Sequence, residues 1–239
     1  MNQADSRRDE LRDNLALVRS RIDQACGTAG RDPSEVHLIA VTKLFPASDA
    51  ALLAELGVHD LGESRDQEAS VKAAQVSELT TATVRWHFVG RLQSNKARSV
   101  AAYAHLVHSL DRPVLVEALS AARRRLGRGE LEVLIQVSLD EDVDRGGVHP
   151  DGLAQLADQV ADAEQLTLAG LMAVAPLNAA PDPAFERLAE LAGQLRSQHP
   201  GATVLSAGMS GDFESAIRHG ATHVRIGTAL LGRRAPSFG

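Results

Sequence analysis

The feature that most constrains the fold of this chain is an alternation of short apolar runs with stretches of helical periodicity, repeated along most of the sequence. Parallel strands need a crossover connection, usually a helix, so this order predicts parallel pairing. A single (β/α)8 TIM barrel closes such a sheet most economically, and an open doubly wound sheet is the alternative. The expected strands are Val36–Val41, Asp60–Gly62, Val84–Val89, Leu106–Ser109, Leu131–Val137, Leu168–Val174, Val204–Ala207 and Val224–Ile226.

Helical periodicity lies between these runs and also precedes the first of them. Leu11, Leu15, Val18 and Ile22 recur at steps of three or four, which predicts an extra N-terminal amphipathic helix over Arg7–Ala25. No low-complexity linker or charge run divides the chain, so we expect residues 1–239 to form a single domain. The other expected helices include Ser48–Leu56, Pro113–Arg125, Pro150–Ala163 and Pro183–Gln198.

Composition bounds the core, the partners and the compartment. Hydrophobic residues make up 44% of the chain but aromatic residues only 3%, so aliphatic side chains must fill the core. A net charge of −6 argues against a general nucleic-acid binder. The first segment is too charged for a signal peptide, and no apolar run approaches membrane-spanning length, which predicts a cytoplasmic protein with no membrane partner.

Cysteine and histidine usage argues against a metal site. Cys26 is the only cysteine, so we expect a buried thiol near the end of the first helix and no internal disulfide. His105 and His108 are the closest pair of histidines, but residues three apart in a strand face opposite sides. We therefore expect no metal to be bound.

Lys43 is the first residue that suggests chemistry. Functional groups of such barrels sit at the C-terminal ends of the strands, and Lys43 follows the apolar run VHLIAVT. A Schiff base needs a neutral amine, and a partly desolvated lysine loses its proton more readily than one in water. The alternative is a lysine that merely ends a strand and reaches solvent.

Two glycine-containing segments near the end of the chain predict a phosphate site. Ser210 lies in LSAGMSGDFESAI, just before an expected helix, where outward-pointing amides favour an anion. In HVRIGTALLG, Gly227 and Thr228 would present backbone amides, and Arg225 would add a permanent cation. The loops after strands 7 and 8 are the usual phosphate site of this fold. The alternatives are an N-cap at Ser210 or Gly211 and a surface ion pair at Arg225.

Eight segments then resemble, in order, the motifs of the pyridoxal phosphate homeostasis protein family, whose members bind pyridoxal 5'-phosphate (PLP) on a barrel related to the N-terminal domain of alanine racemase. WHFVGRLQSNK and LSAGMSGDF…VRIGT are the longest and most specific of them. The resemblance covers most of the chain, from about residue 36 to 234. The segments are AVTKLFP, LGESRDQE, WHFVGRLQSNK, VHSLD, IQVSLDED, GLMAVAP, LSAGMSGDFESAI and VRIGTALLG.

The resemblance implies a role for each candidate residue. Lys43 matches the family's Schiff-base lysine, and Ser210 with the amides of Gly227 and Thr228 matches its phosphate cradle. Arg225 matches the arginine that faces the pyridine nitrogen of the cofactor. Because arginine does not readily give up a proton, that nitrogen would stay unprotonated and the ring would be a weaker electron sink.

His87 and several departures from the family pattern concern the shape of the pocket. We place His87 near the cofactor ring, with a satisfied core histidine as the alternative. Ser64 replaces the family's usual asparagine, Arg91 a frequent histidine and Arg145 a frequent lysine. These changes affect the fine shape of the pocket and any secondary PLP site, and they leave the lysine and phosphate motifs intact.

Three functions are compatible with a lysine facing a phosphate cradle. The first is a non-catalytic protein that buffers, carries or delivers PLP, with apo forms of PLP-dependent enzymes as transient partners. The second is a PLP-dependent racemase or decarboxylase, which needs opposed acid and base groups and, in the related enzymes, a further β domain. The third is an aldolase-like enzyme acting on a sugar phosphate. We favour the first and expect a monomer.

Overall fold

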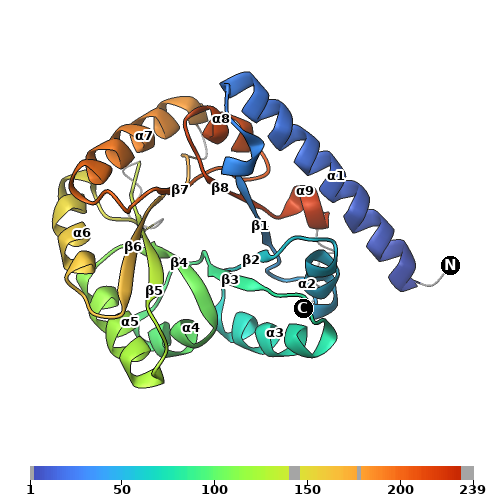
Figure 1. The fold of residues 1–239 in the computed structure, drawn as a ribbon, viewed down its shortest axis with the longest axis horizontal. Coiled ribbons are helices and arrows are strands. Elements are labelled where there is room, and N and C mark those ends of the chain that lie inside the picture. The colour runs from blue at the N-terminus through green and yellow to red at the C-terminus, as the bar shows by residue number, and fades with distance from the viewer. Residues whose placement is uncertain (1–2, 140–145, 177–178, 233–239) are drawn as a thin grey trace.

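A computed structural model describes residues 3–139, 146–176 and 179–232, and its strands close into a barrel (Figure 1). All neighbouring strands are parallel, in the order β1 to β8, and β1 pairs with β8. The predicted barrel is confirmed and the open-sheet alternative is wrong. The strands are β1 (His37–Val41), β2 (Asp60–Glu63), β3 (Arg85–Phe88), β4 (Ala104–Leu110), β5 (Leu131–Gln136), β6 (Leu166–Met172), β7 (Val204–Ser206) and β8 (His223–Ile226).

The helices form a ring outside the strands, so most strand residues are buried on both faces (Figure 1). The α-helices are α1 (Gln3–Ala29), α2 (Ala47–Glu55), α3 (Asp66–Leu79), α4 (Ala97–Tyr103), α5 (Pro113–Leu126), α6 (Leu153–Ala161), α7 (Pro181–Gln198), α8 (Phe213–Arg218) and α9 (Thr228–Leu231). Short 3-10 turns occur at η1 (Pro33–Glu35), η2 (Ser94–Lys96) and η4 (Pro150–Gly152). None of the helices in the described part of the chain is both long and apolar enough to cross a membrane.

The extra N-terminal helix α1 packs along the outside of the barrel against α8 and α9 (Figure 1). It buries the predicted apolar stripe, Leu11, Leu15, Val18 and Ile22, together with Cys26. Two expected helices differ in their first turn. The helix expected from Pro150 begins as the 3-10 turn η4, and α7 begins at Pro181 rather than Pro183, because a proline is tolerated at the first helical position.

The interior of the barrel is divided between apolar and polar side chains. Leu106, Leu134, Ala169 and Met172 form a small apolar cluster from β4, β5 and β6. Buried polar side chains come from β2, β3, β4, β7 and β8: they are Asp60, His87, His108, Ser206 and Arg225. Polar groups inside a barrel core must form hydrogen bonds with one another, because water does not reach them. This requirement shapes the site above them.

Candidate functional site

A cavity of about 420 Å³ opens where the C-terminal ends of the strands meet. It brings together the predicted Lys43, Ser210, Arg225, Gly227 and Thr228, although these residues follow or belong to three different strands. The rest of its lining is Val41, Phe45, Ser64, Val89, Met172, Val174, Met209, Gly211 and Gly232. Among these described lining residues, the groups that ionise are the Lys43 amine and the Arg225 guanidinium.

Arg225 is a buried cation at the base of this cavity. It is 5% exposed, and it donates from Nη1 to Ser206 Oγ at 2.7 Å and from Nη2 to the Ala173 carbonyl at 2.9 Å. Burial lowers the pKa of Arg225 to about 10, so the guanidinium remains charged near neutral pH. Asp212 acts on Arg225 through a coulombic interaction that opposes this shift, but no carboxylate of the described residues forms an ion pair with it. Because Arg225 is buried, the alternative of a surface ion pair is wrong. Its charge is available to a ligand in the cavity.

The loops after β7 and β8 meet at Ser210. The Ser210 hydroxyl accepts a hydrogen bond from the Ala229 amide in the first turn of α9, at 3.3 Å. The residue before α8 is Asp212, whose carboxylate accepts from the Met209 amide at 2.6 Å. Neither Ser210 nor Gly211 is therefore the N-cap of α8, and that alternative is wrong. The Ser210 side chain instead joins two loops that line the cavity.

Gly208 fixes the path of the loop that carries Ser210. Its φ of +90° is disfavoured for other residues, and a Cβ there would lie 2.7 Å from Phe213 Cα. The Arg225 amide also donates to the Gly208 carbonyl at 2.9 Å. This close packing sets where Ser210 stands relative to β8.

Lys43 lies between two residues whose backbone is held by a buried network. The Thr42 carbonyl accepts from Lys72 Nζ at 2.8 Å, and the Leu44 amide donates to Glu68 Oε1 at 2.5 Å. Leu44 has a φ of +65°, a left-handed conformation that is uncommon for residues other than glycine. The surrounding contacts thus impose a turn that directs the chain after β1 and positions Lys43 in the cavity lining.

An ion pair inside the protein anchors this network. Lys72 Nζ lies 2.6 Å from Glu63 Oε1, and the two side chains are 5% and 0% exposed. Thr42 Oγ1 also donates to Glu63 Oε1 at 2.7 Å. Burial raises the pKa of Glu63, an effect that outweighs the hydrogen bonds from Lys72 and Thr42. Lys72 was not among the residues predicted from the sequence, although the i, i+4 pair Glu68 and Lys72 on α3 was an available signal.

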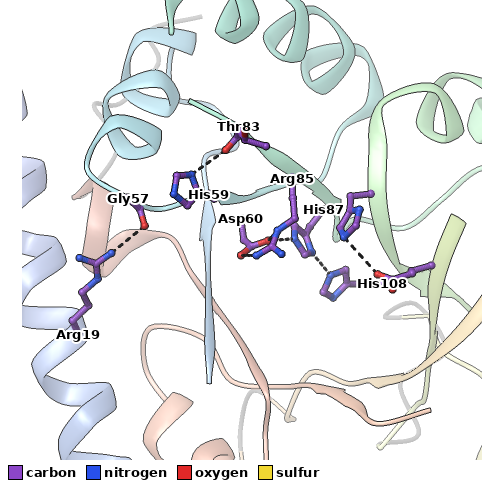
Figure 2. Close-up of polar contacts among 10 residues, drawn as sticks. Arg19, Gly57, His59, Asp60, Thr83, Arg85, His87 and His108 are labelled. Carbon is purple, nitrogen blue, oxygen red and sulfur yellow. Dashed lines mark hydrogen bonds and ion pairs between the residues drawn. The ribbon is translucent and has the colours of Figure 1, made fainter. Parts of the chain in front are cut away.

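His87 lies inside the barrel and is not among the described residues that line the cavity. Figure 2 shows it between Asp60 and His108: its Nε2 is 2.8 Å from Asp60 Oδ1, and its Nδ1 is 3.0 Å from His108 Nε2. It is a histidine with both ring nitrogens satisfied, as the alternative supposed. A direct contact between His87 and the cofactor ring stays a prediction.

The positions that depart from the family pattern have different surroundings. Ser64 lines the cavity, and a Cβ at Gly90 would lie 2.0 Å from the Ser64 carbonyl oxygen, so the loop after β3 packs tightly behind it. Arg91 lines an adjoining cavity of about 560 Å³, together with Arg65, Lys96 and Arg112. Arg145 lies outside the described residues.

Sequence comparison places the chain among known proteins. The profile for "Alanine racemase, N-terminal domain" matches residues 7–235. The "Pyridoxal phosphate homeostasis protein" of Mycobacterium leprae is 47% identical over 240 residues, covering 95% of this chain and 93% of that protein. The protein of the same name from Escherichia coli K12 is 38% identical over 233 residues, covering 95% and 97%.

Solved structures give the same relationship. PipY of Synechococcus elongatus, determined with PLP bound, superimposes with a TM-score of 0.82 at 34% identity and covers 93% of this chain and 100% of its own. Alanine racemase from Corynebacterium glutamicum shares the fold, with a TM-score of 0.68 at 16% identity over 93% of this chain and 60% of that one. The cavity, the profile and these relatives agree, and the chain belongs to the pyridoxal phosphate homeostasis protein family, on a barrel of the alanine racemase N-terminal type.

Proposed function

We propose that this protein binds PLP as a Schiff base on Lys43 and takes part in intracellular PLP homeostasis by buffering, carrying or delivering the cofactor. One observation carries the proposal: an amine, a hydroxyl on a glycine-containing loop and a buried cation without a carboxylate partner in the described chain line one cavity. The names of the relatives and the PLP held by PipY support the same ligand.

The described residues fit three polar parts of PLP, namely its phosphate, its pyridine nitrogen and its aldehyde. Ser210 Oγ and the amides of Gly227 and Thr228 would hold the phosphate, next to the first turn of α9. Arg225 would face the pyridine nitrogen as a hydrogen-bond donor, because a guanidinium has no acceptor to offer. Lys43 Nζ would condense with the aldehyde carbon, forming a C=N bond with loss of one water, and hydrolysis reverses this step.

The same lining argues for binding without substantial turnover. Racemisation needs two opposed groups that exchange protons with the substrate. The described lining supplies Lys43 and a guanidinium, which is a poor proton donor. Tyr103, the only tyrosine, is absent from the lining, and burial raises the pKa of its hydroxyl. An arginine beside the pyridine nitrogen also limits how well the ring accepts electrons.

Borohydride reduction in the presence of PLP tests the attachment site. The chain has three lysines, Lys43, Lys72 and Lys96, so peptide mass mapping of the reduced protein is unambiguous. We expect the added mass on the Lys43 peptide, and its loss in Lys43→Ala with weak, phosphate-anchored binding retained. Lys96→Ala, which alters the adjoining cavity, is the matched control and should label normally. Unchanged labelling of Lys43→Ala would refute the assignment.

Transfer to an apo-enzyme tests the biological role. The loaded protein is mixed with an apo PLP-dependent enzyme while an excess of a free-PLP scavenger is present. Activation of the enzyme despite the scavenger supports delivery, and activation only without it supports buffering. Sustained racemisation or decarboxylation of an amino acid, lost in Lys43→Ala, would contradict the non-catalytic proposal. We further propose that the protein acts in the cytoplasm as a monomer.

A further inference from the structure

A chain of hydrogen bonds crosses the polar half of the barrel and ends on Arg225. It starts at Asp60, which accepts from Arg85 at 2.7 and 2.5 Å, and passes through His87 to His108 (Figure 2). From His108 Nδ1 it continues to Ser206 Oγ at 2.9 Å. Arg225 Nη1 completes it by donating to the same hydroxyl at 2.7 Å.

This chain of hydrogen bonds connects the two ends of the barrel. The Arg85 side chain is 46% exposed and lines a cavity at the N-terminal end of the strands, with Asp60 beside it. The intervening His87, His108 and Ser206 are each at most 1% exposed. Arg225, at the other end, lines the proposed PLP cavity.

When both histidines are neutral, the two fixed ends determine the direction of every hydrogen bond between them. An ionised Asp60 only accepts, so His87 must carry its proton on Nε2, and its Nδ1 then accepts from His108 Nε2. His108 Nδ1 is thereby left as an acceptor, and the Ser206 hydroxyl must donate to it. The lone pairs of Ser206 Oγ then face Arg225, which only donates. The ring nitrogens of both histidines and the Ser206 hydroxyl are all satisfied when both histidines are neutral Nε2–H tautomers.

The electrostatics of the interior favour that protonation state. Burial lowers the pKa of both His87 and His108, which keeps the rings neutral. Burial alone would raise the pKa of Asp60, but the hydrogen bonds from His87 and Arg85 lower it below its usual range. Asp60 is therefore ionised at neutral pH, as the directed chain requires.

The hydrogen-bond chain also helps to set the plane of the Arg225 guanidinium. Ser206 holds Nη1, and the Ala173 carbonyl holds Nη2. Leu106, Leu134, Ala169 and Met172 fill the other part of the interior without any polar atom in their side chains except a thioether. Those apolar side chains need no hydrogen-bond partners, whereas the buried polar groups behind Arg225 carry a desolvation cost that their mutual hydrogen bonds must offset.

We propose that His108 and Ser206 are positioning residues that orient the Arg225 guanidinium toward the pyridine nitrogen of PLP, through a one-directional hydrogen-bond chain anchored at Asp60. This inference rests on the proposed function for its ligand. Its two halves, the tautomers and the effect on the ligand, are measured separately.

The tautomers are measured on the protein without added PLP. In ¹⁵N NMR at neutral pH, His87 and His108 should each show a protonated Nε2 and an unprotonated Nδ1, with resonances assigned from His87→Gln and His108→Gln. An Nδ1–H or doubly protonated ring at either position would overturn the directed chain.

The effect on the ligand is measured by the absorption spectrum and retention of bound PLP. Ser206→Ala removes the acceptor from Arg225, and we expect a shifted spectrum and retention about three- to tenfold weaker, the loss of roughly one hydrogen bond. His108→Leu should act in the same direction. His108→Gln, whose side-chain amide can donate to His87 and accept from Ser206, should keep the wild-type spectrum.

The outcomes separate this inference from the proposed function. If wild-type Lys43 is not labelled by PLP, the proposed function fails, whatever the tautomers are. If wild type is labelled but Ser206→Ala and His108→Leu both keep its spectrum and retention, the positioning role is overturned. If His108→Leu does not fold, Ser206→Ala alone decides the test. This variant removes a single oxygen atom, and circular dichroism verifies that it is folded.

Discussion

Replacing Lys72 with methionine tests whether the buried ion pair behind Lys43 stabilises the fold. Methionine retains most of the apolar stem but removes the ammonium that contacts the Thr42 carbonyl, Glu63 and Glu68 at 2.8, 2.6 and 2.9 Å. Glu63 is 0% exposed, so the substitution leaves an uncompensated carboxylate in the interior. Breaking such a pair from one side costs about 3–5 kcal/mol, a large part of the usual 5–15 kcal/mol of total stability.

Thermal unfolding at pH 7, followed by circular dichroism, measures this cost. For a chain of this length we expect a melting temperature lower by about 6–20 °C, at roughly 2–4 °C per kcal/mol. The double variant Lys72→Met with Glu63→Gln should recover part of the loss, because no buried charge remains. Arg187→Met, which breaks a pair whose side chains are 50% and 55% exposed, is the control and should cost at most about 1 kcal/mol.

A second signature distinguishes a stranded charge from lost packing. Without Lys72, the already raised pKa of Glu63 should rise further, so the folded state binds a proton more tightly than the unfolded state. The variant should therefore gain stability relative to wild type as the pH falls through the folded pKa of Glu63. A loss no larger than that of Arg187→Met, with no such pH dependence, would refute the reasoning.

Three further predictions address the cavity and the interior. Arg225→Glu should shift the absorption of bound PLP and add some amino-acid exchange activity, because a carboxylate would let the pyridine nitrogen hold a proton; an unchanged spectrum and reactivity would mean that residue 225 does not face this nitrogen. Acidification should destabilise the protein: burial lowers the pKa of His108 and lowers that of His223 to about 3, so below the unfolded value of about 6.5 the unfolded state binds more protons. Each such histidine contributes up to about 1.4 kcal/mol per pH unit, and His108→Gln should reduce the slope of the unfolding free energy by one proton. Gly208→Ala should weaken PLP retention at least tenfold, because its Cβ would lie 2.7 Å from Phe213 Cα and displace the Ser210 loop; retention equal to wild type would show that this loop tolerates the shift.

The barrel itself was predictable from local patterns. Strands buried on both faces read as continuous apolar runs, and all eight expected runs overlap a strand of the closed sheet. The N-terminal helix was predictable for a similar reason, since its stripe of Leu11, Leu15, Val18 and Ile22 is buried. Element ends were less predictable, as the late start of α6 and the early start of α7 show, because a proline fits several positions of a first helical turn.

The cavity lining was predictable from motif position, but the groups behind it were not. Lys43 and Ser210 follow strands and Arg225 lies near the end of β8, so the position of functional groups at the C-terminal ends of barrel strands brings them to one face. The contact between His87 and His108 depends on the register of β3 against β4, which includes an irregularity between Trp86 and His87. No local pattern encodes that register.

Both ends of the proposed ligand site store free energy that folding alone would not require. Beside Lys43, Leu44 is held in a left-handed conformation and the Glu63–Lys72 pair is buried. At the other end, Arg225 is a buried cation that forms no ion pair with a carboxylate of the described residues. Such costs persist where a ligand uses the geometry, because binding is strongest when the groups need not reorganise. The C=N bond proposed for Lys43 would be reversible and would permit release by hydrolysis. A protein that holds PLP firmly in orientation, by a bond that water can open, is chemically suited to storing and passing on the cofactor rather than to transforming a substrate with it.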